Sequence, residues 1–224
     1  MSPRGKTISQ IDPAMQQVPG RRSQSDRKEE SRAKLIKAAI ELLGTNGYSG
    51  TTLIEIGRRA GLSRGLVTFH FGTKEQIMIA VVATIRERVQ STLVGENFRG
   101  LEAIDQLVDN YLLGDVDSGS TIRAMYIIIM ESVTSSPGLR PSVAEHNTVF
   151  RNLVAGWISE ALDDDQVEPH SDPYTLATVV EGLLRGALIQ YIVEPSAVDR
   201  ADVAMLVKHM IRNQLRATAT DSSA

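Results

Sequence analysis

The chain has 224 residues, of which 42% are hydrophobic and 23% charged, and its formal net charge is −3. This composition is typical of a soluble globular protein with one large or two small domains. The chain has no cysteine, which excludes disulfides and thiolate chemistry, and it lacks an apolar run long enough for a signal peptide or a membrane span. We therefore expect a cytoplasmic protein.

The charge is unevenly distributed along the chain. Residues 1–80 carry 13 Lys and Arg against 7 Asp and Glu, a net of +6, whereas residues 81–224 carry 11 against 20, a net of −9. A basic front on an acidic body is expected when the front faces a polyphosphate such as DNA. The alternative is chance clustering of the basic residues.

The N-terminal segment 1–24 is rich in Pro, Ser, Gln and basic residues and shows no helical period, which predicts a disordered basic arm. Such an arm is either a solvated tail or a contact to DNA. The first helix is expected to start at a cap formed by Asp26 with Glu29 and to end at Asn46 and Gly47.

The stretch Thr51–Glu75 has the start and stop signals of three short helices. Thr52 with Glu55 and Thr73 with Gln76 fit capping boxes, and Ser63 fits an N-cap between them. Gly61 lies where a turn between two helices needs a positive φ. The segment therefore predicts a helix-turn-helix. Arg64, Gly65 and Thr68 point away from the apolar face, where they can meet a DNA major groove, although any three-helix unit contains such a turn.

Several short motifs around this stretch agree in spacing. They are Gly47-Tyr48, Thr51-Thr52, Ile56-Gly57, Ala60-Gly61-Leu62-Ser63 and Phe69-His70-Phe71-Gly72-Thr73-Lys74-Glu75. From about Glu30 to Val82 the chain resembles the TetR family of bacterial repressors. One departure is the pair Val67-Thr68, where the family commonly has Leu-Tyr, so the tyrosine that often contacts a phosphate is here the shorter Thr68.

The resemblance implies a helix-turn-helix domain over residues 25–72 and a helical ligand-binding and dimerisation domain over residues 73–216, followed by a frayed tail at 217–224. We expect Arg64 to read a base. The side chains of Thr52, Thr68, His70 and Lys74 are expected mostly to bind phosphates. The expected DNA-binding residues are Thr52, Ser63, Arg64, Gly65, Thr68, Phe69, His70 and Lys74.

The rest of the chain is predicted to be all helical, because no stretch alternates between apolar and polar residues. Helices are expected from residue 73 to about 93, 101–112, 121–133, from about Pro141 to the acidic run at 163–165, from Asp172 to about Tyr191, and 198–216. Residues 124–130, AMYIIIM, are apolar on every side, which favours a central position.

The last two helices have wide apolar faces, and Gly182 and Gly186 stand four residues apart in the first of them. Each glycine costs a helix about 1 kcal/mol against alanine, which close approach of a partner helix can offset. These faces either pack within one chain or, as the resemblance implies, form a four-helix interface in a homodimer. The expected interface residues are Val180, Gly182, Leu183, Gly186, Ala187, Val203, Leu206, Val207 and Met210.

The resemblance also implies a cavity for a small-molecule effector among the central helices. Aromatic and methionine side chains suit an adaptable apolar pocket, although most such residues serve as ordinary core. The expected lining residues are Tyr111, Met125, Tyr126, Ile129, Met130, His146, Phe150, Trp157 and Arg185.

Enzymatic activity is not expected. Gly61-Leu62-Ser63-Arg64-Gly65 matches the G-x-S-x-G motif of hydrolases, but that motif needs a preceding strand and a parallel sheet, which this sequence lacks. The histidines show no metal-ligand spacing, so we expect neither a metal nor a cofactor. The sequence predicts a dimeric, ligand-responsive repressor of a palindromic double-stranded operator, with no membrane partner; the alternatives are a nonspecific nucleoid-type DNA binder and a small helical enzyme.

Overall fold

The computed structural model describes residues 23–94, 98–114, 120–165 and 172–215. Over these ranges the chain forms nine α-helices, one short 3-10 helix and no β-strand, as the sequence predicts. Most of the expected arm (1–22) and all of the expected tail (217–224) lie outside the described residues.

Helix α1 (Gln24–Gly50) begins one residue before the expected domain boundary. Ser23 is its N-cap, and Ser23 and Asp26 each accept a hydrogen bond from the backbone N–H of the other, both at 3.0 Å. The prediction that Asp26 is itself the cap was wrong, because its carboxylate completes the capping box of the serine three residues earlier. Gly47 has a φ of +70°, so the helix kinks there and its last turn takes a new direction.

Helices α2 (Leu53–Ala60) and α3 (Arg64–Phe71) form the helix-turn-helix. Thr52 and Ser63 cap them, each accepting a hydrogen bond from a backbone N–H at 3.2 Å. Gly61 ends α2 with a φ of +67°, the left-handed conformation that the turn requires. The carboxylate of Glu55 pairs with Arg58 in place of closing the expected box with Thr52.

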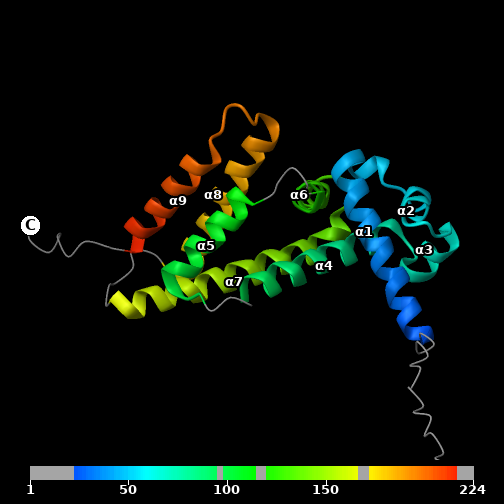
Figure 1. Cartoon of the computed structure of the whole chain (residues 1–224), viewed down its shortest axis with the longest axis horizontal. Helices are drawn as coiled ribbons and strands as arrows, with labels where there is room; N and C mark the ends of the chain where they lie inside the picture. The colour runs from blue at the N-terminus through cyan, green and yellow to red at the C-terminus, as the bar shows by residue number, and fades with distance from the viewer. Residues whose placement is uncertain (1–22, 95–97, 115–119, 166–171, 216–224) are drawn as a thin grey trace, which may run out of the picture.

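The remaining elements are α4 (Lys74–Val94), α5 (Gly100–Leu113), α6 (Ser120–Val133), the 3-10 helix η1 (Pro137–Leu139), α7 (Arg140–Asp165), α8 (Pro173–Val193) and α9 (Arg200–Leu215). Figure 1 shows α1–α3 as a head at one end, with α4 and α7 running side by side away from it and α5, α8 and α9 gathered at the other end. Helix α6 lies between the two groups and packs extensively against α1.

Two apolar clusters hold these groups together. The first joins α1, α2 and α3 to α4, α6 and the start of α7, and its fully buried members include Leu35, Ile56 and Ile77. The second joins α5, α7, α8 and α9 around residues such as Leu184 and Leu188. Since burial of one large aliphatic side chain contributes about 1.5–3 kcal/mol, the first cluster fixes the head on α4 and α6.

Among the described helices, α8 alone is long and apolar enough to cross a membrane by length and composition, a test that core helices of soluble proteins also pass. It packs against α7 in the structure. Its Glu181 is 4% exposed and forms ion pairs with Arg185 and Arg151. Helix α8 therefore packs against protein through charged as well as apolar side chains.

Candidate DNA-binding surface, effector cavity and dimer face

The outer face of α3 is the candidate DNA-binding surface. Val67 and Phe71, four residues apart, are buried against the head, so the helix turns its other side to solvent. That side brings together five of the predicted residues, all exposed: Ser63, Arg64, Gly65, Thr68 and Phe69. Phe69 is 70% exposed, a large apolar ring turned to solvent on this face.

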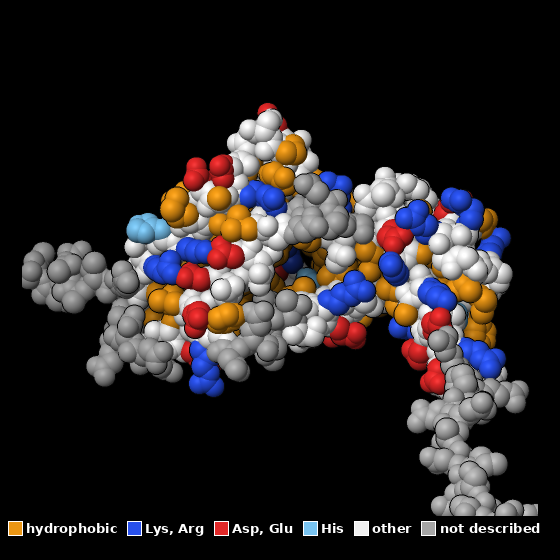
Figure 2. All heavy atoms as spheres, viewed as in Figure 1, with side chains coloured by type: hydrophobic (Ala, Val, Ile, Leu, Met, Phe, Trp, Pro, Cys, Tyr) orange, Lys and Arg blue, Asp and Glu red, His pale blue; other side chains and the backbone are white. Residues whose placement is uncertain are grey.

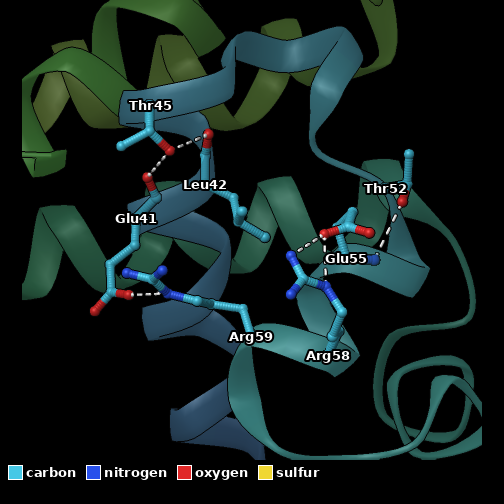
Figure 3. A network of polar contacts seen from close by, with 7 residues as sticks. All are labelled: Glu41, Leu42, Thr45, Thr52, Glu55, Arg58 and Arg59. Carbon is cyan, nitrogen blue, oxygen red and sulfur yellow. Dashed lines mark hydrogen bonds and ion pairs between the residues drawn. The ribbon is translucent and has the colours of Figure 1, made fainter.

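The position of α3 is set by α2 and α1. A Cβ on Gly57 of α2 would lie 2.9 Å from the Leu62 carbonyl oxygen and 3.2 Å from Val67, so only glycine permits this close packing of α2 against the turn and α3. Figure 3 shows the polar contacts on the other side of α2, where Arg59 donates to Glu41 of α1 at 2.8 Å and Arg58 pairs with Glu55. Helix α2 is therefore fixed between α1 and α3.

The first turns of α1 lie beside α3. The Lys28 ammonium is 5.8 Å from the centre of the Phe69 ring, and a shallow depression between the helices is lined by Gln24, Ser25 and Leu66 in addition to charged groups. Figure 2 shows Lys and Arg side chains spread over this end of the molecule. Gln24, Ser25 and Leu66 are surface residues that the sequence did not indicate, because no local pattern links α1 to a helix 40 residues later.

Two predicted phosphate-binding residues are engaged within the head. His70 Nε2 lies 2.8 Å from the Ser31 hydroxyl, and burial, with Lys28 and Arg32 nearby, lowers the pKa of His70. Lys74 Nζ donates to the Tyr48 carbonyl at 2.5 Å and lies 3.9 Å from the centre of the Tyr48 ring. Both side chains join α3 and α4 to α1, and Thr52 is exposed at the start of α2.

A cavity of about 260 Å³ lies among α4, α5, α6, α7 and α8. Six predicted lining residues form part of its wall, namely Tyr111, Met125, Tyr126, His146, Phe150 and Arg185. Eight others complete it: Ile85, Arg88, Val89, Leu107, Asn110, Thr121, Ile122 and Glu181. Figure 2 shows the visible face hollowed between the head and the far group of helices.

Three predicted lining residues lie elsewhere. Ile129 packs against the cluster of the head, Met130 is 58% exposed, and Trp157 belongs to the second cluster. Residues 124–130 are apolar on every side of the helix, so the sequence pattern does not show which side faces the cavity. It could not predict that Met125 and Tyr126 face the cavity while Ile129 and Met130 lie away from it.

Most polar groups of the cavity wall pair with one another, and one buried nitrogen does not. The Tyr111 and Tyr126 hydroxyls lie 2.9 Å apart, and burial raises the pKa of both phenols, so both are protonated at neutral pH. Arg185 pairs with Glu181 at 2.7 Å and donates to the Asn147 side-chain oxygen at 2.8 Å. His146 is 7% exposed, and its Nδ1 has no hydrogen-bond partner in the described part of the chain.

A groove between α8 and α9 contains the candidate dimer face. Most of the predicted residues line it, and Leu206 and Met210 are 58% and 44% exposed. A Cβ on Gly182 or Gly186 would meet nothing within 4 Å, so the chain's own packing does not require these glycines. Val180 is the exception, since it is fully buried in the second cluster and cannot contact a partner chain.

Comparison with known proteins agrees with these features. Residues 35–81 match the family model described as bacterial regulatory proteins, tetR family. The chain is 37% identical over 156 residues to the HTH-type transcriptional regulator CymR of Pseudomonas putida, covering 67% of this chain and 76% of that protein. It is 24% identical over 193 residues to the HTH-type transcriptional repressor AcnR of Corynebacterium glutamicum, covering 84% and 96%.

The fold is also found in solved structures. A transcriptional regulator from Saccharomonospora viridis, solved in complex with choline, superposes with a TM-score of 0.69 at 19% identity, over 82% of this chain and 96% of that one. Helix-turn-helix, helical body and sequence similarity thus lead to one identification. The chain belongs to the TetR family of bacterial regulatory proteins, and it is a DNA-binding transcriptional regulator rather than an enzyme.

Proposed function

We propose that the protein is a dimeric repressor that binds a palindromic operator in the cytoplasm and is released by a small, largely apolar effector. Residues 25–72 act as the DNA-binding domain and residues 73–216 as the effector-binding and dimerisation domain. The observation that carries this proposal is the exposed outer face of α3, where Arg64, Thr68 and Phe69 stand clear of the apolar cluster that holds the helix.

Helix α3 enters the major groove, and Arg64 reads a base. Its exposed guanidinium is in the first turn of the helix, the part that meets base edges in helix-turn-helix complexes. Gly65 supports this orientation, because a Cβ there would be 3.7 Å from the nearest atom, the Ser63 hydroxyl oxygen, so the protein itself leaves room for a larger residue. Because Gly65 has no side chain, the DNA can approach the backbone of α3 closely.

Dimerisation through α8 and α9 brings together two copies of α3, one from each subunit. The exposed apolar side chains of Leu206 and Met210, beside two glycines with free space above them, suit the close packing of a second copy. A two-fold dimer selects a palindromic operator because it presents the same α3 to both half-sites. AcnR, named a repressor, is similar over nearly its whole length, which favours repression over activation.

The effector acts through α4 and α6. Both helices line the cavity with one part of their surface and pack in the apolar cluster of the head with another. An effector that binds better to one arrangement of these helices shifts the dimer toward that arrangement and changes the spacing of the two copies of α3.

The first test is fluorescence anisotropy of DNA from immediately upstream of the gene against scrambled DNA of equal length, across a salt series. We expect the upstream DNA to bind more tightly at physiological salt. Equal binding that vanishes with salt would indicate a nonspecific phosphate binder, since phosphate contacts carry no sequence information.

Variants separate base reading from phosphate binding. Arg64→Ala should lose about 1–3 kcal/mol of discrimination between operator and scrambled DNA. Lys28→Ala should weaken binding to both DNAs alike and lower the salt dependence by about one charge. Arg99→Ala, which removes an exposed arginine at the start of α5, is the control for loss of one positive charge. Full operator preference in Arg64→Ala would contradict the role given to Arg64.

A further inference from the structure

The wall of the effector cavity is positively charged. His146 and the two tyrosines of the wall are neutral at neutral pH, and its other ionisable groups are the exposed Arg88, the half-buried Arg185 and one carboxylate, Glu181. Glu181 is 4% exposed and is flanked by two guanidinium groups, Arg185 at 2.7 Å and Arg151 at 3.4 Å. One carboxylate between two half-buried arginines leaves an excess of one positive charge in this cluster.

The protonation state of Glu181 does not reverse that excess. Burial raises the pKa of Glu181, while Arg185 and Arg151 oppose that rise. If the carboxylate is ionised, the cluster carries one net positive charge; if it takes up a proton, the cluster carries two. In either state a half-buried charge without an equal opposite charge has a desolvation cost, and an incoming anion relieves it.

His146 is a second feature of the wall that an incoming ligand could satisfy. Its buried Nδ1 has no hydrogen bond to any of the residues that the structure describes, which costs about 1–3 kcal/mol unless a partner arrives. Burial, and then Arg185 of α8 and Arg86 of α4, lower the pKa of His146 to about 4. Both of these arginines pair with a carboxylate, Arg86 with Glu145 and Arg185 with Glu181, and their positive charges still act on the imidazole.

The rest of the wall is apolar and the space is small. Leu107, Ile122, Met125 and Phe150 supply aliphatic and aromatic surface from three helices. A volume of about 260 Å³ lies near the lower end of the range of about 300–1000 Å³ for small-molecule pockets. The cavity therefore suits a compact apolar body with one polar end.

We propose that the effector is a small apolar carboxylate, whose anionic end lies against Arg185 and His146 and whose body packs on Met125 and Phe150. This inference rests on the effector-binding function proposed above and names the chemical class of the effector. A cation is disfavoured, because it would face Arg185 and Arg88, while the one buried carboxylate is already paired twice. The charge of this cavity thus favours the opposite class from the choline found in the Saccharomonospora viridis regulator.

Three probes with the same apolar body test the charge preference. Isothermal titration calorimetry of the full chain at neutral pH compares 4-phenylbutyrate, 4-phenylbutyramide and 4-phenylbutylamine, which carry a negative charge, no charge and a positive charge. We expect the carboxylate to bind at least about tenfold more tightly than the amide, which is the scale of one charge-assisted hydrogen bond, and the amine to bind most weakly.

Two variants move the affinity in opposite directions. Arg185→Gln should weaken binding of 4-phenylbutyrate by about tenfold or more and should change binding of the amide far less. Glu181→Gln should tighten binding of 4-phenylbutyrate severalfold, because it removes the carboxylate that competes for Arg185. A gain in affinity cannot arise from misfolding. Arg59→Gln breaks an ion pair in the head and serves as the matched control without effect on this binding.

Equal or tighter binding of the amide or the amine would overturn the assignment of the charge class, and so would weaker carboxylate binding by Glu181→Gln. Binding of none of the three probes would overturn it as well. These outcomes are distinct from failure of the proposed function, which is measured separately by operator binding. A protein that prefers its operator but binds only the amine remains a ligand-responsive regulator with an effector of another charge.

Discussion

Acid should destabilise this protein partly through a single residue, His146. The pKa of its imidazole is about 4 in the folded protein, against an ordinary value of 6.5, and burial is the main cause. The unfolded chain therefore binds more protons than the folded chain as the pH falls from 6.5 to 4. The stability associated with neutral His146 is fully present above pH 6.5 and is lost as the pH falls toward 4.

The size of this loss follows from the two pKa values. Each pKa unit corresponds to about 1.4 kcal/mol, so the full contribution is about 3 kcal/mol, of which about 2 kcal/mol is already lost at pH 5. The residue is 7% exposed, so solvent screening reduces this value little. The loss is a substantial part of the 5–15 kcal/mol that is typical of folded proteins.

The measurement compares the unmodified chain with His146→Gln by guanidinium unfolding from pH 7.5 to 4, at one fixed protein concentration. Glu181 and the other carboxylates titrate in both proteins, so the difference between the two curves isolates the imidazole. We expect His146→Gln to gain about 3 kcal/mol relative to the unmodified chain across this range. Parallel curves would mean that His146 protonates normally in the folded protein, and the burial argument would be wrong.

Three other predictions follow from particular contacts. Gly57→Ala should cost about 1–3 kcal/mol of unfolding free energy, because its Cβ would lie 2.9 Å from the Leu62 carbonyl oxygen; chemical denaturation measures this. Gly65→Ala should raise stability by up to about 1 kcal/mol in the same assay yet weaken operator binding in anisotropy, and an unchanged affinity would argue against close docking of α3. Leu206→Asp should convert the proposed dimer to a monomer in light scattering, since it places a charge on an exposed apolar face, and a dimer mass retained by the variant would place the interface elsewhere.

The helix boundaries were largely predictable because their signals are local. Ser63, Gly61 and Asp172 act at the ends of helices through their own side chains or backbone, and each does so in the structure. The start of α1 was misplaced because two overlapping boxes, from Ser23 to Asp26 and from Asp26 to Glu29, are equally good as sequence patterns. Only the geometry of the chain distinguishes them.

The cavity was less predictable because it depends on helical phase and on contacts between distant helices. In the run from Ala124 to Met130 every residue is apolar, so the pattern could not tell Met125, which lines the cavity, from Met130, which is exposed. Glu181 is a cavity residue that the sequence pattern does indicate. A carboxylate between Val180 and Gly182, in an otherwise apolar stripe, needs a buried partner, and Arg185 stands one helical turn later.

The cavity lies at the boundary between the two apolar clusters of the molecule. Ile85 and Met125 belong to the cluster that holds the head, whereas Leu107 and Phe150 belong to the cluster of α5, α7, α8 and α9. Val89 packs against both clusters. An effector at this boundary contacts the part that carries α3 and the part that carries the dimer face at the same time.

Under the proposed function, that position would let a small ligand affect DNA binding without contacting the surface of the head. Any change in the separation of the two clusters alters the position of α3 relative to α8 and α9, and hence the spacing of the two half-site contacts in a dimer. A tenfold preference of the effector for one separation shifts the equilibrium by only about 1.4 kcal/mol, so full release needs a larger preference. The polar wall residues Arg185, His146 and Glu181 come from the second cluster's side, on α7 and α8, while Met125 and Ile85 come from the head's side. The proposed effector would therefore contact the second cluster's side through both its charged end and its apolar body, and the head's side through the apolar body alone, so shortening that body should reduce the coupling to α3.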